Sequence, residues 1–386
     1  MKSRMKKAVV YLSMALMLVL TACGAQKEEK EVDPEKIISE ELTFDHSMKL
    51  EYAEKFSVDY YDKGFTLLSV EDEGQFLVVP KNEKAPEDLK EGIKVIQGPV
   101  KNIYLVATAT MDMFRSIDAI DKISLSGTEA EKWYIPEAKE AMESGQIEYA
   151  GKYSEPDYEK ILEKGCSVSI QSTMVNRSPE VKENLEKFEI PVIVDHSSYE
   201  KDPQGRMEWV KFYGALVGKD KEAKKAFDEQ KKEMDQMMGK EKTGKTVAFF
   251  NITSKGMVNV RKPNDYIAQI INLAGGTYIF DDITDGDKNS TTMNMQLEEF
   301  YAGAKDADYI VYNSTLDGGV QSLEELLAKN EMLRDFKAVK NGNVFCATKN
   351  LYQDSMKLGD VTKDFNKMLT MEEGKDEELS YMFRLK

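Results

Sequence analysis

The sequence predicts an α/β protein with two Rossmann-like lobes joined by a long linking helix. The chain has 386 residues, a length that suits two or three domains. Apolar residues make up 41% and charged residues 32%, a composition typical of globular proteins rather than of disordered or collagen-like chains. Two series of strands alternate with helices, and an all-helical stretch separates them, which indicates parallel sheets in two separate lobes.

The N-terminus has the pattern of a lipoprotein signal peptide. Lys2, Arg4, Lys6 and Lys7 precede an apolar run that is too short for an ordinary membrane span. The sequence Leu-Thr-Ala-Cys, which ends at Cys23, then resembles a bacterial lipobox. We expect residues 1–22 to be removed and Cys23 to carry a lipid, which would anchor the protein to the outer face of the bacterial cytoplasmic membrane. The alternative is an ordinary secretory signal followed by a chance cysteine.

The N-terminal α/β lobe is expected over residues 48–200. Residues 23–47 are predicted to be a flexible tether, because their first part is rich in Glu and Lys. Residues 48–80 predict an antiparallel hairpin or meander, and then strands and helices alternate. The predicted strands lie at residues 103–107, 123–125, 149–150, 168–170 and 191–194, and the helices between them at 111–117, 133–143, 158–164 and 179–188.

Residues 201–242 predict a helical linker that contains the interlobe helix. Asp202 can cap the first helix, and Pro203 suits its first turn. We expect Gly214 and Gly218 to end this helix. A second helix over residues 220–238 would span about 28 Å, the width of a domain.

Residues 243–386 predict the C-terminal α/β lobe. Strands are expected at residues 246–251, 258–260, 309–312 and 343–346, and helices at 265–273, 297–304, 323–329 and 357–369. The last residues are charged, and we expect them to fray.

Composition and motifs exclude several classes of function. The net charge of −16 disfavours a nucleic-acid partner. His46 and His196 are the only histidines, so a His-rich metal site and most general-base schemes are not expected. Residues 239–246 match the P-loop formula, but a helix precedes them and a strand follows, the reverse of what phosphate binding needs. The sequence therefore predicts no catalytic residue and no metal site, and Cys166 and Cys346 are expected to be two buried thiols rather than a pair.

One segment has the pattern Gly-x-Tyr…Pro-x-x-Glu-x-Ile, with Gly151, Tyr153, Pro156, Glu159 and Ile161 at its defined positions. In this pattern the chain resembles the class III substrate-binding lipoproteins of ABC importers, which serve ferric siderophores, haem and cobalamin. Further similar segments occur in the expected order at residues 102–110, 190–194, 213–218, 273–276, 297–299, 308–311 and 338–344. The resemblance implies a class III periplasmic-binding-protein fold, a monomer with a rigid linking helix, and an ABC importer permease as partner.

The resemblance also implies one acidic residue per lobe that docks on the permease. By position these are Glu159 and Glu298. The alternative for each is a solvated carboxylate on a helix face.

Candidate ligand-binding residues follow from the expected sheets, because ligands occupy the crevice beyond the carboxyl ends of parallel strands. Arginine suits anionic chelates, since its guanidinium makes bidentate contacts with oxygen atoms. The candidates are Thr108, Thr110, Met111, Tyr153, Thr173, Met174, Arg177, Ser198, Tyr199, Arg206, Asn259, Arg261 and Tyr352.

The function expected from these features is capture of an iron chelate, such as a ferric siderophore, in the interlobe cleft and its delivery to the permease. Cobalamin is an alternative ligand that would favour aromatic contacts, and haem is another, with Tyr or Met as conceivable ligands. No cofactor is expected beyond such a ligand. A lipid-anchored extracellular enzyme or a sensor is the alternative from a different class.

Overall fold

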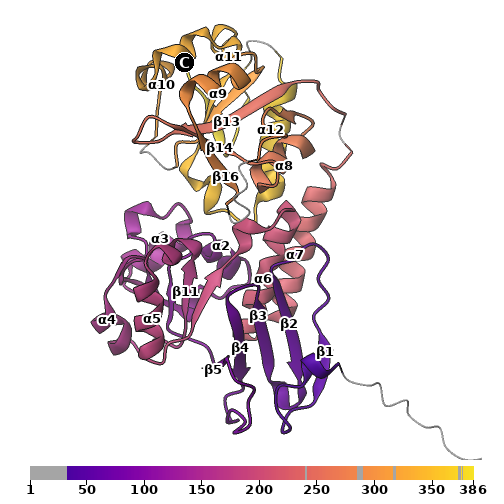
Figure 1. Cartoon of the computed structure of the whole chain (residues 1–386), viewed down its shortest axis with the longest axis vertical. Helices are drawn as coiled ribbons and strands as arrows, with labels where there is room; N and C mark the ends of the chain where they lie inside the picture. Colours follow the sequence, from indigo (N-terminus) through magenta and orange to yellow (C-terminus); the bar gives the residue numbers. More distant parts are fainter. Residues whose placement is uncertain (1–32, 240, 285–289, 316–318, 373–374, 376) are drawn as a thin grey trace, which may run out of the picture. The chain divides into compact units, whose positions relative to one another are not determined.

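The computed structural model describes residues 33–239, 241–284, 290–315, 319–372, 375 and 377–386 (Figure 1). The expected signal peptide, Cys23 and the first part of the tether lie outside these residues. One compact unit runs from Ser39 to Lys386. The unit before it ends at Ile38, and its described part holds the short 3-10 helix η1 (Pro34–Lys36).

The larger unit begins with a sheet of its own. Its strands follow the order β1-β2-β3-β4-β5, with antiparallel pairing except between β4 and β5, which are parallel. These strands are β1 (Phe44–Ser47), β2 (Phe56–Tyr61), β3 (Thr66–Val70), β4 (Gly74–Val79) and β5 (Ile93–Gln97). The expected meander corresponds to β2–β4. Since β1 pairs with β2, the sheet begins inside the segment for which we expected a tether.

The N-terminal lobe contains a parallel sheet of order β12-β11-β6-β7-β8. The strands β6, β11 and β12 are almost wholly buried, so they form continuous apolar runs, as in a sheet covered on both faces. The strands are β6 (Ile103–Leu105), β7 (Ile123–Ser126), β8 (Glu148–Tyr149), β11 (Ser169–Ser172) and β12 (Val192–Asp195), and the helices α2 (Thr110–Ser116), α3 (Pro136–Glu143), α4 (Tyr158–Glu163) and α5 (Pro179–Lys187).

Two packed helices, rather than one, connect the lobes. Helix α6 (Pro203–Val217) is capped by Asp202, whose side chain accepts a hydrogen bond of 2.7 Å from the Gln204 N–H, and ends at Gly218, which has φ 71°. The expectation that Gly214 also ends this helix is wrong. A Cβ at Gly214 would lie 2.4 Å from the Cβ of Ala223, so this glycine allows close contact with α7 (Asp220–Asp235).

The C-terminal lobe has a mixed sheet of order β16-β14-β13-β17-β18-β19, with β15 beside β13. Strands β13, β17 and β18 are parallel, whereas β14, β16 and β19 pair antiparallel. The strands are β13 (Thr246–Ile252), β14 (Val258–Arg261), β15 (Thr277–Tyr278), β16 (Thr292–Met295), β17 (Tyr309–Tyr312), β18 (Val344–Ala347) and β19 (Met382–Arg384). The helices are α8 (Tyr266–Leu273), α9 (Leu297–Ala304), α10 (Leu323–Lys329), α11 (Lys337–Lys340) and α12 (Leu358–Thr370).

The expectation that the C-terminus frays is wrong. Strand β19 pairs with β18, and the Asp364 carboxylate accepts hydrogen bonds from the backbone of Ser380 and Tyr381, at 2.6 and 2.8 Å. These hydrogen bonds fix the C-terminal segment on the lobe, although its charged side chains predicted exposure to solvent.

One continuous apolar core joins the first sheet, both lobes and the linker. Phe56 of β2 packs edge-on against Trp209 of α6, with ring centroids 5.0 Å apart. Helix α6 also contacts α2 of the N-terminal lobe and α8 of the C-terminal lobe. Cys166 and Cys346 form no disulfide, as expected, and Cys346 is buried whereas Cys166 is only half-buried. The α/β fold class with two lobes is therefore confirmed, with a further sheet built onto the linker.

Candidate ligand-binding cleft

A cavity of about 550 Å³ lies beyond the carboxyl ends of β11 and β12. The N-terminal lobe contributes side chains from the two short 3-10 turns that follow these strands, η5 (Thr173–Arg177) and η6 (Ser197–Tyr199). Asn264 and Thr291 come from the C-terminal lobe, and the turn between β3 and β4 also borders the cavity. The location is the one expected for a ligand of an open parallel sheet.

The described side chains that line this cavity are all polar or charged. They are Lys55, Glu71, Asp72, Glu73, Thr173, Asn176, Arg177, His196, Tyr199, Lys201, Asn264 and Thr291. Tyr199 is the only tyrosine in this set, and its hydroxyl donates a hydrogen bond of 3.4 Å to Thr173 Oγ1. Such a wall suits a hydrophilic ligand better than a flat apolar one.

Glu73 is a charged residue of the cleft that has two partners in the N-terminal lobe. Lys182 Nζ donates to Glu73 Oε2 at 2.6 Å, and His196 Nε2 lies 3.1 Å from Glu73 Oε1. Burial by itself would raise the pKa of Glu73, but the hydrogen bonds from His196 and Lys182 outweigh it and lower the pKa to about 2. Glu73 is therefore ionised at neutral pH and fastens the β3–β4 turn to the N-terminal lobe.

Three of the residues predicted from the sequence line the cavity: Thr173, Arg177 and Tyr199. The Arg177 side chain is exposed and has no hydrogen bond or ion pair with any described residue. An unpaired guanidinium at the mouth of a polar cleft can make bidentate contacts with the oxygen atoms of a ligand.

Two further predicted arginines are buried where α6 meets the C-terminal lobe. The Arg206 guanidinium lies 4.4 Å from the centre of the Tyr266 ring, and its Nε and Nη1 have no acceptor within the described part of the chain. The guanidinium of Arg261 contacts the Tyr352 hydroxyl and lies 3.6 Å from Asp265 Oδ2. Although burial by itself would lower the pKa of Arg261, Tyr352 and Asp265 outweigh it and raise that pKa.

Four of the remaining predicted residues are engaged in contacts within the fold. Thr110 is buried and donates to the Ala107 carbonyl at 2.6 Å, and Met111 is wholly buried in the core. The Asn259 amide donates to Asn294 Oδ1 at 2.9 Å, between β14 and β16. Tyr153 packs against the smaller apolar cluster of the N-terminal lobe. These four side chains are engaged within the fold, so the structure does not support their assignment to the ligand.

Thr108, Met174 and Ser198 are half-buried and lie near the ends of β6, β11 and β12. They are not among the described residues that line the cavity. These three residues lie after the strands, as predicted, but residues next to them in the chain line the cavity instead.

The periplasmic binding protein family matches residues 106–351 of this chain, well over half of its length. The chain belongs to this family. Two uncharacterized lipoproteins of Methanocaldococcus jannaschii are each 26% identical to it. One alignment covers 90% of this chain and 89% of that protein, and the other covers 87% and 86%.

Solved structures share the fold of this family member. An ABC-type Fe3+-hydroxamate transport system from Saccharomonospora viridis has a TM-score of 0.57 and 17% identity, and covers 71% of this chain and 94% of that chain. The periplasmic heme binding protein of Vibrio cholerae has a TM-score of 0.57 and 14% identity, with 70% and 99% covered. The periplasmic vitamin B12 binding protein of Vibrio cholerae has a TM-score of 0.50 and 15% identity, with 70% and 97% covered. These likenesses show that the chain shares the two-lobed fold of these proteins.

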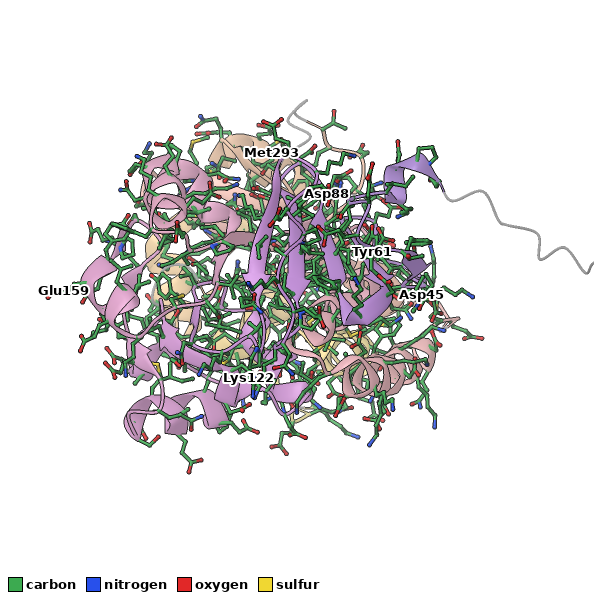
Figure 2. The ribbon with its side chains drawn as sticks, turned by 90° about the horizontal axis from the view of Figure 1, so that it is seen from below. Asp45, Tyr61, Asp88, Lys122, Glu159 and Met293 are labelled. Carbon is green, nitrogen blue, oxygen red and sulfur yellow. The ribbon has the colours of Figure 1, made fainter. Side chains whose placement is uncertain are left out.

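The two residues expected to dock on a permease are exposed. Glu159 and Glu298 each lie in the first turn of a helix, α4 and α9 respectively. Figure 2 shows Glu159 at the periphery of the molecule. Within the described ranges, none of the helices combines the length and the apolar composition needed to cross a bilayer.

Sequence reasoning missed nine of the residues that line the cleft. They are Lys55, Glu71, Asp72, Glu73, Asn176, His196, Lys201, Asn264 and Thr291. Asn176, His196 and Lys201 neighbour predicted residues after β11 and β12, so the strand-end rule could have found them. The residues of the first sheet carry no such signal, because their place at the cleft depends on how the sheet packs on α6.

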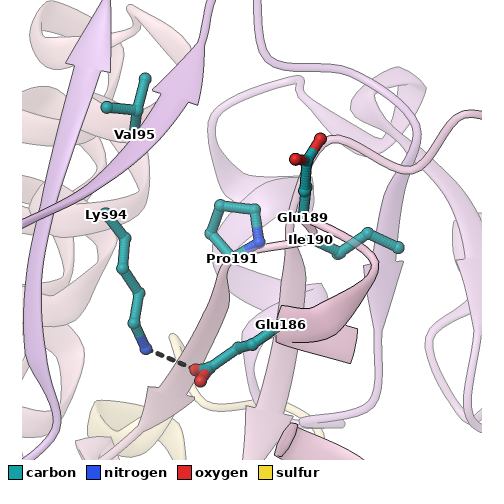
Figure 3. A pocket seen from close by; sticks show the side chains of 6 residues that line it. All are labelled: Lys94, Val95, Glu186, Glu189, Ile190 and Pro191. Carbon is teal, nitrogen blue, oxygen red and sulfur yellow. Dashed lines mark hydrogen bonds and ion pairs between the residues drawn. The ribbon is translucent and has the colours of Figure 1, made fainter. Parts of the chain in front are cut away.

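A smaller pocket of about 250 Å³ lies between β5 and the segment that joins α5 to β12 (Figure 3). An ion pair between Lys94 and Glu186 bridges it, and Val95, Ile190 and Pro191 form its apolar part. The described residues that line it include none from the C-terminal lobe, so we assign it to the junction between the first sheet and the N-terminal lobe.

Proposed function

We propose that this protein is the lipid-anchored solute-binding protein of an ABC importer, and that it captures a ferric siderophore in the cleft and delivers it to the permease. Membership of the periplasmic binding protein family supports the binding role. The lipobox at Cys23 and the names of the lipoproteins from Methanocaldococcus jannaschii support an extracytoplasmic, lipid-anchored location.

The polar wall of the cleft is the observation that carries the choice of ligand. Haem and corrinoids present large ring faces, which binding sites usually cover with apolar and aromatic side chains. The described wall of this cleft instead offers amides, hydroxyls and charged groups, with Arg177 free to bind oxygen atoms. A hydrophilic metal chelate matches this chemistry.

The buried arginines support the same proposal. Leaving a buried donor without an acceptor costs about 1–3 kcal/mol, so such a group calls for an explanation, such as a bound ligand or water. Arg206 keeps two buried nitrogen atoms in this state among the described residues. Its guanidinium packs on the ring of Tyr266 in the C-terminal lobe, and Asn264, two residues before Tyr266, lines the cavity.

The experiment is a thermal-shift screen of the full chain in detergent against ferric siderophores, cobalamin and haem. A ligand present at 100 times its Kd should stabilise the protein by about 2.7 kcal/mol. We expect a ferric siderophore to raise the melting temperature, and Arg177→Ala to weaken its binding by about 1–3 kcal/mol without changing the melting temperature of the free protein.

Lys187→Ala is the matched control, because Lys187 is an exposed cation on α5 away from the cleft. It should leave binding unchanged. A response to cobalamin or haem alone, or equal affinities of the Arg177 variant and the parent protein, would contradict the proposal.

A further inference from the structure

The first sheet (β1–β5) lies before residue 106, where the match to the periplasmic binding protein family begins (Figure 1). The solved structures reported above cover 70–71% of the chain, while one Methanocaldococcus lipoprotein aligns with 90% of it. The uncovered tenth is much shorter than the segment before residue 106, so this relative extends into that segment. The sheet is therefore an addition to the matched family core that a full-length relative shares at least in part.

The added sheet is fastened rigidly to the linker by two buried carboxylates. Glu208 of α6 accepts backbone hydrogen bonds from Glu51, Tyr52 and Ala53, at 2.8–3.1 Å. Glu200 accepts two more, from Glu54 at 2.9 Å and Lys55 at 3.0 Å. Hydrogen bonds to a charged acceptor are stronger than those to a neutral one, and the Glu200 and Glu208 side chains are buried from water. The sheet is accordingly a fixed part of the molecule that borders the cleft.

The turn between β3 and β4 is the part of this sheet that reaches the cavity. Residues Glu71, Asp72 and Glu73 form it, and all three line the cavity. Asp72 has a φ of 61°, a conformation that Asp and Asn tolerate better than most residues. The bonds from Lys182 and His196 to Glu73 hold the turn against the N-terminal lobe.

The turn changes the charge of the cavity wall. Lys55, Arg177 and Lys201 bring positive charge, and the three residues of the turn bring an equal number of carboxylates. Lys55 pairs with Glu71, and Lys201 lies 3.1 Å from Glu54. Among the described lining residues, Arg177 and Asp72 are the charged side chains without an ion-pair partner. They leave one positive and one negative group for a ligand.

We infer that the β3–β4 turn is a specificity wall, which selects chelates of low net charge that carry a cationic group to meet Asp72. This inference rests on the proposed function and deepens it. Ferric iron held by three hydroxamates is neutral, whereas three catecholates leave a charge of −3. A trianion would place uncompensated negative charge against Asp72, and like charges in close contact disfavour binding. A tris-hydroxamate with a free amine can place its chelate oxygens at Arg177 and its ammonium at Asp72.

The test is isothermal titration of the full chain in detergent with three probes: a ferric tris-hydroxamate with a free terminal amine, the same chelate acetylated on that amine, and a ferric tris-catecholate. We expect the amine form to bind about fivefold more tightly than the acetylated form, the effect of one partly exposed ion pair. Asp72→Asn should abolish that difference, so that the variant binds the two forms with equal affinity. Asn has the same shape as Asp and also tolerates a positive φ, so the turn should be preserved.

Glu83→Gln is the matched control, because Glu83 is an exposed carboxylate of the loop between β4 and β5, away from the cavity. It should keep the preference for the amine form. If the parent protein binds the catecholate most tightly, or if Asp72→Asn keeps the preference, the specificity wall is refuted while the proposed function stands. If none of the chelates binds, both are refuted.

Discussion

At the scale of single residues, the cleft shows how a buried charge is stabilised by its partners. Glu73 is largely removed from water, yet its pKa falls to about 2 because hydrogen bonds from His196 and Lys182 outweigh the effect of burial. A folded-state pKa below the ordinary value of 4.5 means that the ionised carboxylate contributes stability above pH 4.5. This contribution is lost as the pH falls from 4.5 towards 2.

Glu73→Gln tests this linkage. The variant should lose about 1.5–3 kcal/mol of unfolding free energy at pH 7, since it replaces hydrogen bonds to a charged group by weaker ones. At pH 2 the parent protein has lost most of the same contribution, so the two unfolding free energies should converge. Urea unfolding at both pH values measures this, with Glu83→Gln as an exposed control. A difference that does not change with pH would contradict the linkage.

At the scale of secondary-structure elements, the connection between the lobes depends on the contact between α6 and α7. Gly214 lies inside α6, where glycine is normally unfavourable by about 1 kcal/mol relative to alanine. The short distance to Ala223 explains its presence, because a Cβ at position 214 would overlap the Ala223 side chain. Packing between the two helices thus outweighs the intrinsic preference of one of them.

Gly214→Ala should therefore destabilise the protein by about 1–3 kcal/mol, the usual cost of overpacking, instead of stabilising the helix. Ala223→Gly in the same chain should restore part of the loss, because it removes the overlapping methyl group. The Lys219 carbonyl, 3.0 Å from the added Cβ, should keep the rescue incomplete. Thermal unfolding of the two single variants and the double variant measures this. A stabilised Gly214→Ala variant would show that the helices separate easily.

At the scale of the whole unit from Ser39 to Lys386, the lobes meet directly as well as through the linker. The Gln353 side chain accepts from the Tyr134 N–H and donates to the Lys132 carbonyl, both at 2.8 Å. The Met356 N–H donates to the buried Asp112 carboxylate at 2.8 Å. These bonds tie the segment before α12 to the N-terminal lobe.

Delivery to a permease requires surfaces on both lobes, and the resemblance places them at Glu159 and Glu298. Glu159→Lys and Glu298→Lys should each leave the affinity for the ferric chelate unchanged, because both carboxylates are exposed and outside the described cleft wall. Each should lower uptake of that chelate by cells or by a reconstituted importer, through charge reversal at the contact. Glu222→Lys, an exposed change on α7, is the control. Normal uptake by both variants would refute the docking assignment.

Much of the fold follows from local patterns. The helix predicted at residues 297–304 coincides with α9, and the strand predicted at residues 309–312 coincides with β17, because apolar periodicity and capping residues act over short distances. Strands β1, β5 and β19 escaped prediction. β1 is polar and β19 has only three residues, and in all three cases the pairing with a neighbouring strand completes the sheet.

The candidate site could be predicted only in part. The strand-end rule selected Thr173, Arg177 and Tyr199, which line the cavity, since parallel strands bring their carboxyl ends to one edge of the sheet. It failed for Thr110 and Met111, which follow β6 but turn into the core as α2 begins. The rule locates a backbone position, whereas the direction of each side chain depends on the helix that follows.

The sequence by itself determined the two-lobed α/β class, the helical linker and the family, because these rest on periodicities and motifs that the chain carries locally. Only the tertiary structure decided that a separate sheet adds the acidic turn of Glu71, Asp72 and Glu73 to the cleft. It also decided that Arg206 and Arg261 are buried beside tyrosines rather than exposed. The physical reason is that the place of the acidic turn and the burial of the two arginines depend on packing between segments far apart in the chain. The partners that bury or pair these side chains cannot be predicted from the neighbouring sequence.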